Sequence, residues 1–244
     1  MGEWMAWVPC HLAAIAEREA PQLDRAAALL ADAWQAQHQL FGFGCNHSGL
    51  LVDDLYYRAA TPVFMNPIHV PGLRLDTGAP EYGSALERLP GLSARVLDHA
   101  PVQPGDVLLV VSTSGRNPVP VEMAAQAQAR GLSVVALTSR AAAGSASGPT
   151  VADFAAVVLD SGVPLGDAAL AAPGSPPVPL GPVSTIAGSF LLHAWLLRTV
   201  ERLQAAGLAP PVLLSGNQPG GAEHNRAVLE ELTRRGAWPS PVIP

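Results

Sequence analysis

The residues best suited to chemistry directly follow an apolar run at positions 107–111. They comprise three hydroxyl side chains, a glycine and an amide: Ser112, Thr113, Ser114, Gly115 and Asn117. A helix is predicted over residues 119–130, so this loop lies at a helix N-terminus, where unpaired backbone N–H groups and the helix dipole favour an anion. The side chains add further hydrogen-bond donors. Because capping the helix needs only one such residue, the pattern favours anion binding over a simple turn.

A second polar segment follows the strand predicted at residues 39–44. Asn46, His47 and Ser48 stand next to each other where a helix is predicted to begin, at residues 48–58. One of these side chains is expected to cap the helix, and three together also fit the rim of a ligand site.

This second segment is not a dinucleotide-binding fingerprint. His47 occupies the position of the third glycine in G-x-G-x-x-G, and Asn66 stands where an acidic residue would hold a ribose. We therefore expect no nicotinamide or flavin cofactor.

The elements that must position both segments alternate along the chain. Strands are predicted at residues 39–44, 61–65, 107–111, 132–138 and 152–159, and helices at 12–37 (broken at Pro21), 48–58, 82–97, 119–130, 184–206 and 223–235. The alternation predicts a three-layer, doubly wound, mostly parallel α/β sheet with its ligand site at the carboxyl ends of the strands. Residues 160–182, rich in Pro, Gly and Ala without periodicity, are expected to form a cover over the ligand.

Composition narrows the classes of protein. The 244 residues, 49% of them hydrophobic, predict a single domain over 1–244 with an N-terminal helical segment at about 10–38. A net charge of −6 with 14 Lys plus Arg argues against nucleic-acid and membrane partners, so a bound phosphate should belong to a small molecule.

Cys10 and Cys45 fit neither a zinc site nor a disulfide framework, and His, Asp and Glu lack metal-ligand spacing. Without a signal peptide or a long apolar run, we expect a cytoplasmic protein.

Both polar segments resemble those of the SIS (sugar isomerase) domain family. LLVVSTSGRN at 108–117 looks like the family's strand and serine-rich phosphate loop, and FGFGCNHS at 41–48 looks like its first glycine loop. GPVSTIAG at 181–188 is similar to a segment of an uncharacterised bacterial subgroup of stand-alone SIS proteins. The resemblance runs from about Arg25 to Leu232. It implies an SIS-type, Rossmann-like fold, a phosphorylated sugar as ligand and no cofactor.

The resemblance also implies roles for individual residues. The phosphate would be held by Ser112, Thr113, Ser114, Gly115 and Asn117, the sugar or phosphate by Asn46 or Ser48, and the pocket completed by Ser184 and Thr185. Partner subunits contribute to the site in oligomeric members of this fold, so His224 is a candidate from a second subunit. We expect a homodimer or homotetramer.

Aldose–ketose isomerisation needs a base that moves a proton between adjacent carbons and a group that protonates the carbonyl oxygen. The candidates are Asp54, where family members carry adjacent glutamates, His47 in the ligand-facing loop, and Glu87 on a helix that fold-mates bring toward the pocket. An ordinary solvated position is the alternative for both carboxylates. His193, amid apolar residues, is expected to pack in the core or at an interface.

Three functions remain open within this family resemblance. The fold serves isomerases, an ether-cleaving lyase and ligand-sensing regulators. The roughly 38 residues before the first predicted strand are too few and too acidic for a DNA-binding module, which favours a stand-alone enzyme, most simply a sugar-phosphate isomerase.

Overall fold

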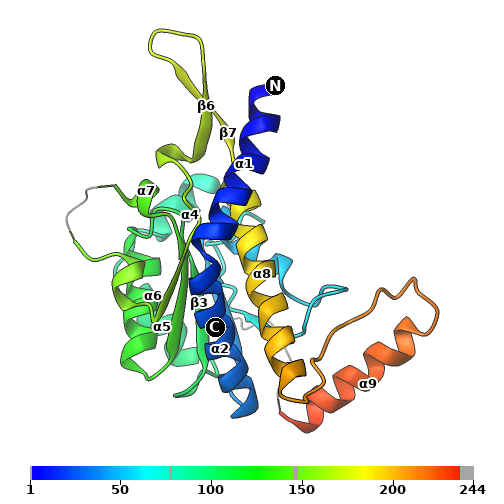
Figure 1. Cartoon of the computed structure of the whole chain (residues 1–244). Helices are drawn as coiled ribbons and strands as arrows, with labels where there is room; N and C mark the ends of the chain where they lie inside the picture. The colour runs from blue at the N-terminus through cyan, green and yellow to red at the C-terminus, as the bar shows by residue number, and fades with distance from the viewer. Residues whose placement is uncertain (1, 77–78, 145–147, 237–244) are drawn as a thin grey trace.

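A computed structural model describes residues 2–76, 79–144 and 148–236. Its main sheet has the strand order β2-β1-β3-β4-β5, and each pair of neighbours is parallel. The strands are β1 (Leu40–Gly44), β2 (Met65–Pro67), β3 (Val107–Val111), β4 (Ser133–Thr138) and β5 (Val157–Asp160). Helices cover both faces of the sheet, which confirms the predicted doubly wound α/β fold (Figure 1).

The helices form the two outer layers. They are α1 (Gly2–Arg18), α2 (Ala20–Gln35), α3 (His47–Asp54), α4 (Pro80–Leu86), α5 (Leu92–His99), α6 (Pro118–Ala129), α7 (Arg140–Ala143), α8 (Ser184–Ala205) and α9 (Gly221–Arg234), with 3-10 turns η1 (Val151–Phe154) and η2 (Leu165–Asp167). Helices α2, α3 and α8 bury their apolar side chains on one face of the sheet, and α5 and α6 bury theirs on the other. Within the described residues, no helix combines the length and apolar character needed to cross a bilayer.

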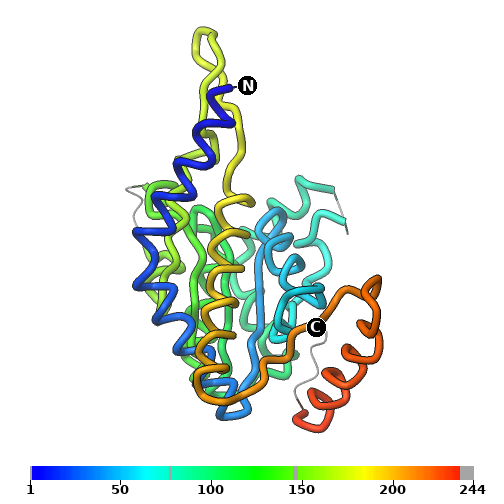
Figure 2. Tube along the Cα trace, turned by 45° about the vertical axis from the view of Figure 1, so that its right-hand side comes forward, coloured from blue at the N-terminus to red at the C-terminus, as the bar shows by residue number. Residues whose placement is uncertain are grey.

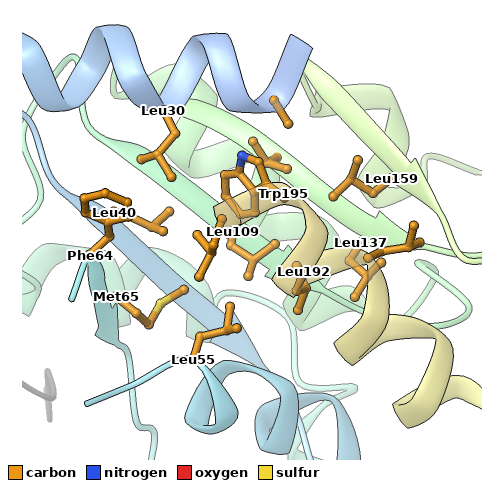
Figure 3. Close-up of a cluster of buried hydrophobic side chains, with 14 of the residues drawn as sticks. Leu30, Leu40, Leu55, Phe64, Met65, Leu109, Leu137, Leu159, Leu192 and Trp195 are labelled. Carbon is orange, nitrogen blue, oxygen red and sulfur yellow. The ribbon is translucent and has the colours of Figure 1, made fainter. Parts of the chain in front are cut away.

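Strand β3 lies at the centre of the sheet, and its side chains alternate between the two layers. Leu109 packs beneath α2 and α8, whereas Leu108 packs beneath α5 and α6. Figure 3 shows Leu109 together with Leu192 and Trp195 of α8 and Leu30 of α2. A strand that is buried on both faces must be apolar throughout, which explains why residues 107–111 show no polar alternation.

Several predicted boundaries are wrong. The strand expected at 152–159 begins only at Val157, after the 3-10 turn η1, the helix expected at 48–58 ends at Asp54, and the first helix begins at Gly2 instead of about residue 12.

The strand expected at residues 61–65 lies further along the chain, as β2, because the residues before it turn toward another segment: the Val63 N–H donates to the Pro211 carbonyl. The helix expected at 82–97 is divided into α4 and α5. Gly91, at φ +83°, makes the turn between them.

The segment at 160–182 contains regular structure that its composition did not indicate. It forms an antiparallel hairpin of β6 (Ala168–Ala172) and β7 (Val178–Pro182) that projects beyond the main sheet beside the N-terminal half of α1 (Figures 1 and 2). The Trp4 indole lies against Gly181, where a Cβ would come within 2.6 Å of the ring. The glycine therefore allows α1 and the hairpin to pack closely.

Candidate functional site

The strand order defines where a ligand should bind. From β1 the chain continues to β2 on one side, and from β3 to β4 on the other, so the order reverses between β1 and β3. Such a switch point leaves a crevice at the carboxyl ends of the strands. A cavity of about 310 Å³ lies there. Of the predicted site residues, its lining includes Asn46, His47, Ser48, Glu87, Ser112, Thr113 and Ser114.

The loop after β3 forms part of the cavity wall through Ser112, Thr113 and Ser114, whereas Gly115 lies outside the lining. Gly115, at φ +63°, donates its N–H to the Ser112 hydroxyl at 3.2 Å, and the Thr113 carbonyl accepts from the Ser139 N–H at 2.9 Å. The backbone N–H groups of Ser114 and Asn117 find no acceptor among the described residues. The Asn117 N–H stands at the N-terminus of α6, and Ser114, which precedes it in the loop, lines the cavity, so the Ser114 N–H is a candidate donor to a bound anion.

The position of Asn117 is that of the α6 N-cap, although its side chain makes no capping hydrogen bond. Its amide is therefore available to a ligand, but Asn117 does not line the cavity itself. Its predicted role in phosphate binding stays a prediction.

Gly115 offers a direct test of the loop geometry. In a Gly115→Ala variant the new Cβ would lie 2.8 Å from Thr138 Oγ1 in a left-handed backbone conformation, so the loop must move. We expect sugar-phosphate affinity to fall more than about tenfold. The left-handed conformation costs an alanine about 1–2 kcal/mol of strain, and the movement of the loop displaces its hydrogen-bond donors. Calorimetric titration measures the loss. Gly207→Ala is the matched control, since Gly207 has φ +74° and open space around it; an equal loss there would contradict the interpretation.

Asn46 and Glu87 form a polar pair in the cavity wall. The Asn46 Nδ2 donates to Glu87 Oε2 at 3.2 Å, and the Asn46 N–H donates to the Leu73 carbonyl at 2.7 Å. Gly83, one turn before Glu87, packs so closely that a Cβ would come within 2.6 Å of Asn46 Oδ1. The Glu87 carbonyl accepts from the Val119 N–H in the first turn of α6. Glu87 is thus held beside the phosphate-loop candidate, and its Oε1 has no partner among the described residues.

The remaining lining residues of the first loop differ in exposure. His47 is exposed and begins α3, so its imidazole is accessible to a ligand. Cys45 is buried below it; burial and then the charge of Glu87 raise the pKa of the Cys45 thiol far above its usual range. Cys45 therefore contributes a protonated, unreactive thiol to the cavity floor.

Asp167 is a lining residue that no sequence pattern indicated. Its Oδ1 accepts from the Val183 and Ser184 N–H groups at 2.9 and 2.7 Å, and its Oδ2 accepts from the Ser184 hydroxyl at 2.7 Å. Asp167 therefore caps α8 from outside the helix. The predicted pocket residue Ser184 binds this carboxylate, and Thr185 is exposed beside it, outside the cavity lining. The start of the segment predicted as a cover, at η2, does line the cavity.

Asp54 lies apart from this cavity. Its Oδ2 accepts from the Ser189 hydroxyl at 3.0 Å and lies 2.9 Å from His193 Nε2, and its Oδ1 pairs with Arg58. Partial burial raises the pKa of Asp54, but the hydrogen bonds from His193 and Ser189 and the charges of Arg58 and His193 outweigh it, so the pKa is below its usual value. The carboxylate joins α3 to α8, and its catalytic role stays a prediction.

This depressed pKa predicts a loss of stability in acid. The Asp54 carboxylate stabilises the fold above its unfolded-state pKa of about 3.9, and this contribution is lost as the pH falls through the lower folded-state value. In an Asp54→Asn variant we expect stability at neutral pH to be lower and its decline below about pH 4 to be shallower. Urea unfolding across pH 2–7 measures both. Parallel curves for the two proteins would contradict the prediction.

His224 also lies away from the cavity within one chain. Its Nε2 is 2.9 Å from the Val212 carbonyl, and it lines a separate cavity with Trp34 and Arg235 between α2 and α9. A role for His224 in another subunit stays a prediction. Among the described residues, no three His, Cys, Asp or Glu side chains gather in a way that could hold a metal ion.

The fold and the cavity together define a class of protein: a doubly wound α/β domain with a hydroxyl-rich loop at the switch point between β1 and β3. The SIS domain model matches residues 3–139, and the chain belongs to this family. A UPF0309 protein of Streptomyces griseus is 43% identical over 230 residues, covering 92% of this chain and 91% of that protein.

Solved structures show the same fold at low sequence identity. A phosphoheptose isomerase from Neisseria gonorrhoeae is 17% identical with a TM-score of 0.51, covering 82% of this chain and 95% of that one. A phosphoheptose isomerase from Francisella tularensis is 16% identical, also with a TM-score of 0.51, covering 82% and 96%.

Proposed function

We propose that this protein binds a phosphorylated sugar at the β1/β3 switch point and isomerises it between its aldose and ketose forms. The observation that carries the proposal is that one cavity holds both a hydroxyl-rich loop at the N-terminus of α6 and two proton-transfer groups, His47 and Glu87. The names of the structural relatives, which are phosphoheptose isomerases, agree with a sugar phosphate as ligand.

The proposed chemistry uses these two groups in turn. Glu87, whose Oε1 is unoccupied, removes the proton from the carbon next to the carbonyl, and His47 gives a proton to the carbonyl oxygen, forming an enediol. Glu87 then returns the proton to the neighbouring carbon while His47 takes one from the other hydroxyl. The reaction is an internal redistribution of protons and electrons, so it needs no redox cofactor.

Asp54 and His193 form a second acid–base pair, next to a cavity lined by Arg58 and His193. The catalytic prediction for Asp54 therefore requires a ligand that reaches this second cavity. Because the phosphate-loop candidate does not line it, we assign the proton transfer first to Glu87 and His47.

Removing one hydroxyl tests the phosphate position. Ser114→Ala is expected to weaken sugar-phosphate binding by about 1–3 kcal/mol, since a charged acceptor loses a donor. The affinity for the matching unphosphorylated sugar should not change. Ser84→Ala, on an exposed position of α4, is the control. Isothermal titration measures the affinities, and an unchanged sugar-phosphate affinity would contradict the placement of the phosphate.

The function itself is tested in two stages. Hexose, heptose and amino-sugar phosphates are first screened for thermal stabilisation, and every ligand that binds is then incubated in deuterium oxide and followed by NMR. Deuterium exchange at the carbon next to the carbonyl, with conversion to the ketose, is the expected result. Binding without exchange would indicate a sensing protein, loss of an ether substituent a lyase, and no stabilisation by any sugar phosphate would overturn the proposal.

A further inference from the structure

A second cavity, of about 270 Å³, lies between the end of α2, the segment at 209–211 and α9. It has no lining residue in common with the switch-point cavity. Its walls are mainly apolar and include Trp34, Pro210, Pro211, Val228 and Leu232. Trp34 and Leu232 also belong to the main hydrophobic core, so the cavity opens onto buried apolar side chains. Such walls are suited to the apolar part of a small molecule.

Hydrogen bonds to other elements hold the walls of this second cavity. The Pro211 carbonyl accepts from the Val63 N–H at 2.8 Å, and the next carbonyl, of Val212, lies 2.9 Å from His224 Nε2 of α9. The two consecutive prolines, Pro210 and Pro211, further restrict the backbone of this wall. The cavity is thus formed before a ligand binds, which lowers the entropy cost of binding.

Arg235 supplies a positive charge that no carboxylate of the described residues pairs with. Its guanidinium carbon lies 4.7 Å from the centroid of the Trp34 ring, and its Nη2 donates to the Trp34 carbonyl at 3.1 Å. Glu231, the acidic residue of the lining, forms its ion pair with Arg234 instead. Stacking on an aromatic ring orients a guanidinium while its remaining N–H groups stay available. The cavity therefore presents an oriented cation beside apolar walls.

The indole of Trp34 adds a neutral donor to this charge. Trp34 is only 3% exposed, and within the described part of the chain its indole N–H has no acceptor. The indole N–H groups of Trp4 and Trp195 are fully enclosed, whereas that of Trp34 is not. Because Trp34 lines the cavity, a ligand there can supply the missing acceptor and recover the free energy that an unpaired donor costs.

We propose that this second cavity binds an apolar monocarboxylate, a molecule with an aryl or acyl body and one carboxylate group. The body packs against Pro210, Val228 and Leu232. The carboxylate accepts from the Arg235 guanidinium and the Trp34 indole N–H, a charge-assisted arrangement for which arginine is well suited. This binding site is additional to the proposed sugar-phosphate site and does not depend on it.

The probe for this site is hydrocinnamate, which joins a phenyl ring to a carboxylate through two methylenes. It is titrated into the full chain with tryptophan indoles labelled with nitrogen-15, and the Trp34 resonance is assigned by its absence from a Trp34→Phe variant. We expect the Trp34 indole resonance to shift much further than that of Trp195, which does not line the cavity. A Trp34 resonance that does not move would overturn the proposal.

The charge is tested first with a neutral ligand. Hydrocinnamamide has the same body without the negative charge, and we expect it to bind at least about tenfold more weakly than hydrocinnamate, since hydrogen bonds to charged groups are the stronger ones. Isothermal titration calorimetry measures both affinities. Equal dissociation constants for the acid and the amide would overturn the proposed contact with Arg235.

Two variants assign the binding to this cavity. Arg235→Gln keeps a side-chain amide that can donate to the Trp34 carbonyl but removes the charge, so the Kd for hydrocinnamate should rise about 10- to 100-fold. Arg226→Gln is the matched control, because Arg226 is an exposed arginine of α9 that lines a different cavity. Wild-type affinity of the Arg235→Gln variant would contradict the assignment.

A substitution that removes no charge keeps the proposal testable if Arg235→Gln folds poorly. Ala227 is an exposed residue of α9 that lines the cavity, so Ala227→Phe places a ring in the space that the probe needs. Binding of hydrocinnamate should be lost in this variant. The Ser114→Ala variant alters only the switch-point cavity and should bind hydrocinnamate as the wild type does. Loss of the probe in Ser114→Ala, or its retention in Ala227→Phe, would overturn the proposal.

Discussion

A Glu87→Gln variant is expected to lose about 10²- to 10⁴-fold in kcat, the usual contribution of a positioned general base. Glutamine has the same length as glutamate, and its carbonyl oxygen can still accept from Asn46 Nδ2. The backbone contact from Val119 to residue 87 is also retained. Proton removal is therefore lost while the shape of the cavity wall is preserved.

The measurement is the initial rate of isomerisation together with ligand affinity from calorimetry. Glu81→Gln is the matched control, because Glu81 lies in α4, the helix that Glu87 caps, and is exposed and outside the cavity lining. Wild-type turnover by the Glu87→Gln variant would remove Glu87 from the reaction. A variant that lost affinity and turnover to the same extent would point to a role in binding.

The largest effect on stability is expected at Trp195. Its side chain is fully buried in the layer between β3 and α2, where it packs with Leu30 and Leu109 (Figure 3). Trp195→Ala removes this contact area and leaves a cavity, which costs about 3–5 kcal/mol of unfolding free energy. Urea denaturation followed by circular dichroism measures the change.

A phenylalanine at the same position provides the comparison. The Trp195 indole N–H is buried and has no hydrogen-bond partner among the described residues. Trp195→Phe keeps an aromatic ring and removes that unsatisfied donor, so its loss of stability should be clearly smaller than that of Trp195→Ala. Equal losses for the two variants would mean that the indole N–H is satisfied or that the cluster collapses around any smaller side chain.

The central strand β3 and the helix after it could be predicted from the sequence because their pattern fits only one structure. A strand buried on both faces must be apolar at every position, and residues 107–111 fulfil this before a helix with clear start signals. The edges could not be predicted in the same way. Residues 61–64 contain apolar side chains suited to a strand, but they pair with the segment around Val212, far along the chain.

The hairpin of β6 and β7 was missed for a different reason. Its strands contain Ala, Pro and Gly, which have low strand propensity, so local composition indicated a loop. Its packing against Trp4 at the other end of the sequence is a tertiary contact. The sequence of the hairpin itself does not indicate a contact with a residue so far away in the chain.

For the site, the sequence indicated that residues following the ends of neighbouring strands lie close together. Asn46 and Ser112 share a cavity because β1 and β3 are adjacent. Distances along helices were harder to foresee. Asp54 lies seven residues after His47 in α3, which is about 10 Å along the helix axis, so the two do not share one pocket. Asp167 was not predicted because its position beside the start of α8 depends on the turn that leads into the hairpin.

The pairing of β1 with β3 has a consequence for how a ligand affects the whole molecule. Leu40 pairs with Val107, so the two loops of the cavity, which are far apart in the sequence, lie together only in the folded chain. A compound that fits the cavity binds the native chain and not its denatured ensemble. At a concentration 100-fold above its Kd, such a compound adds about 2.7 kcal/mol to the unfolding free energy. Because cleavage of the sheet requires the chain to open, such a compound should also slow proteolysis of the whole sheet.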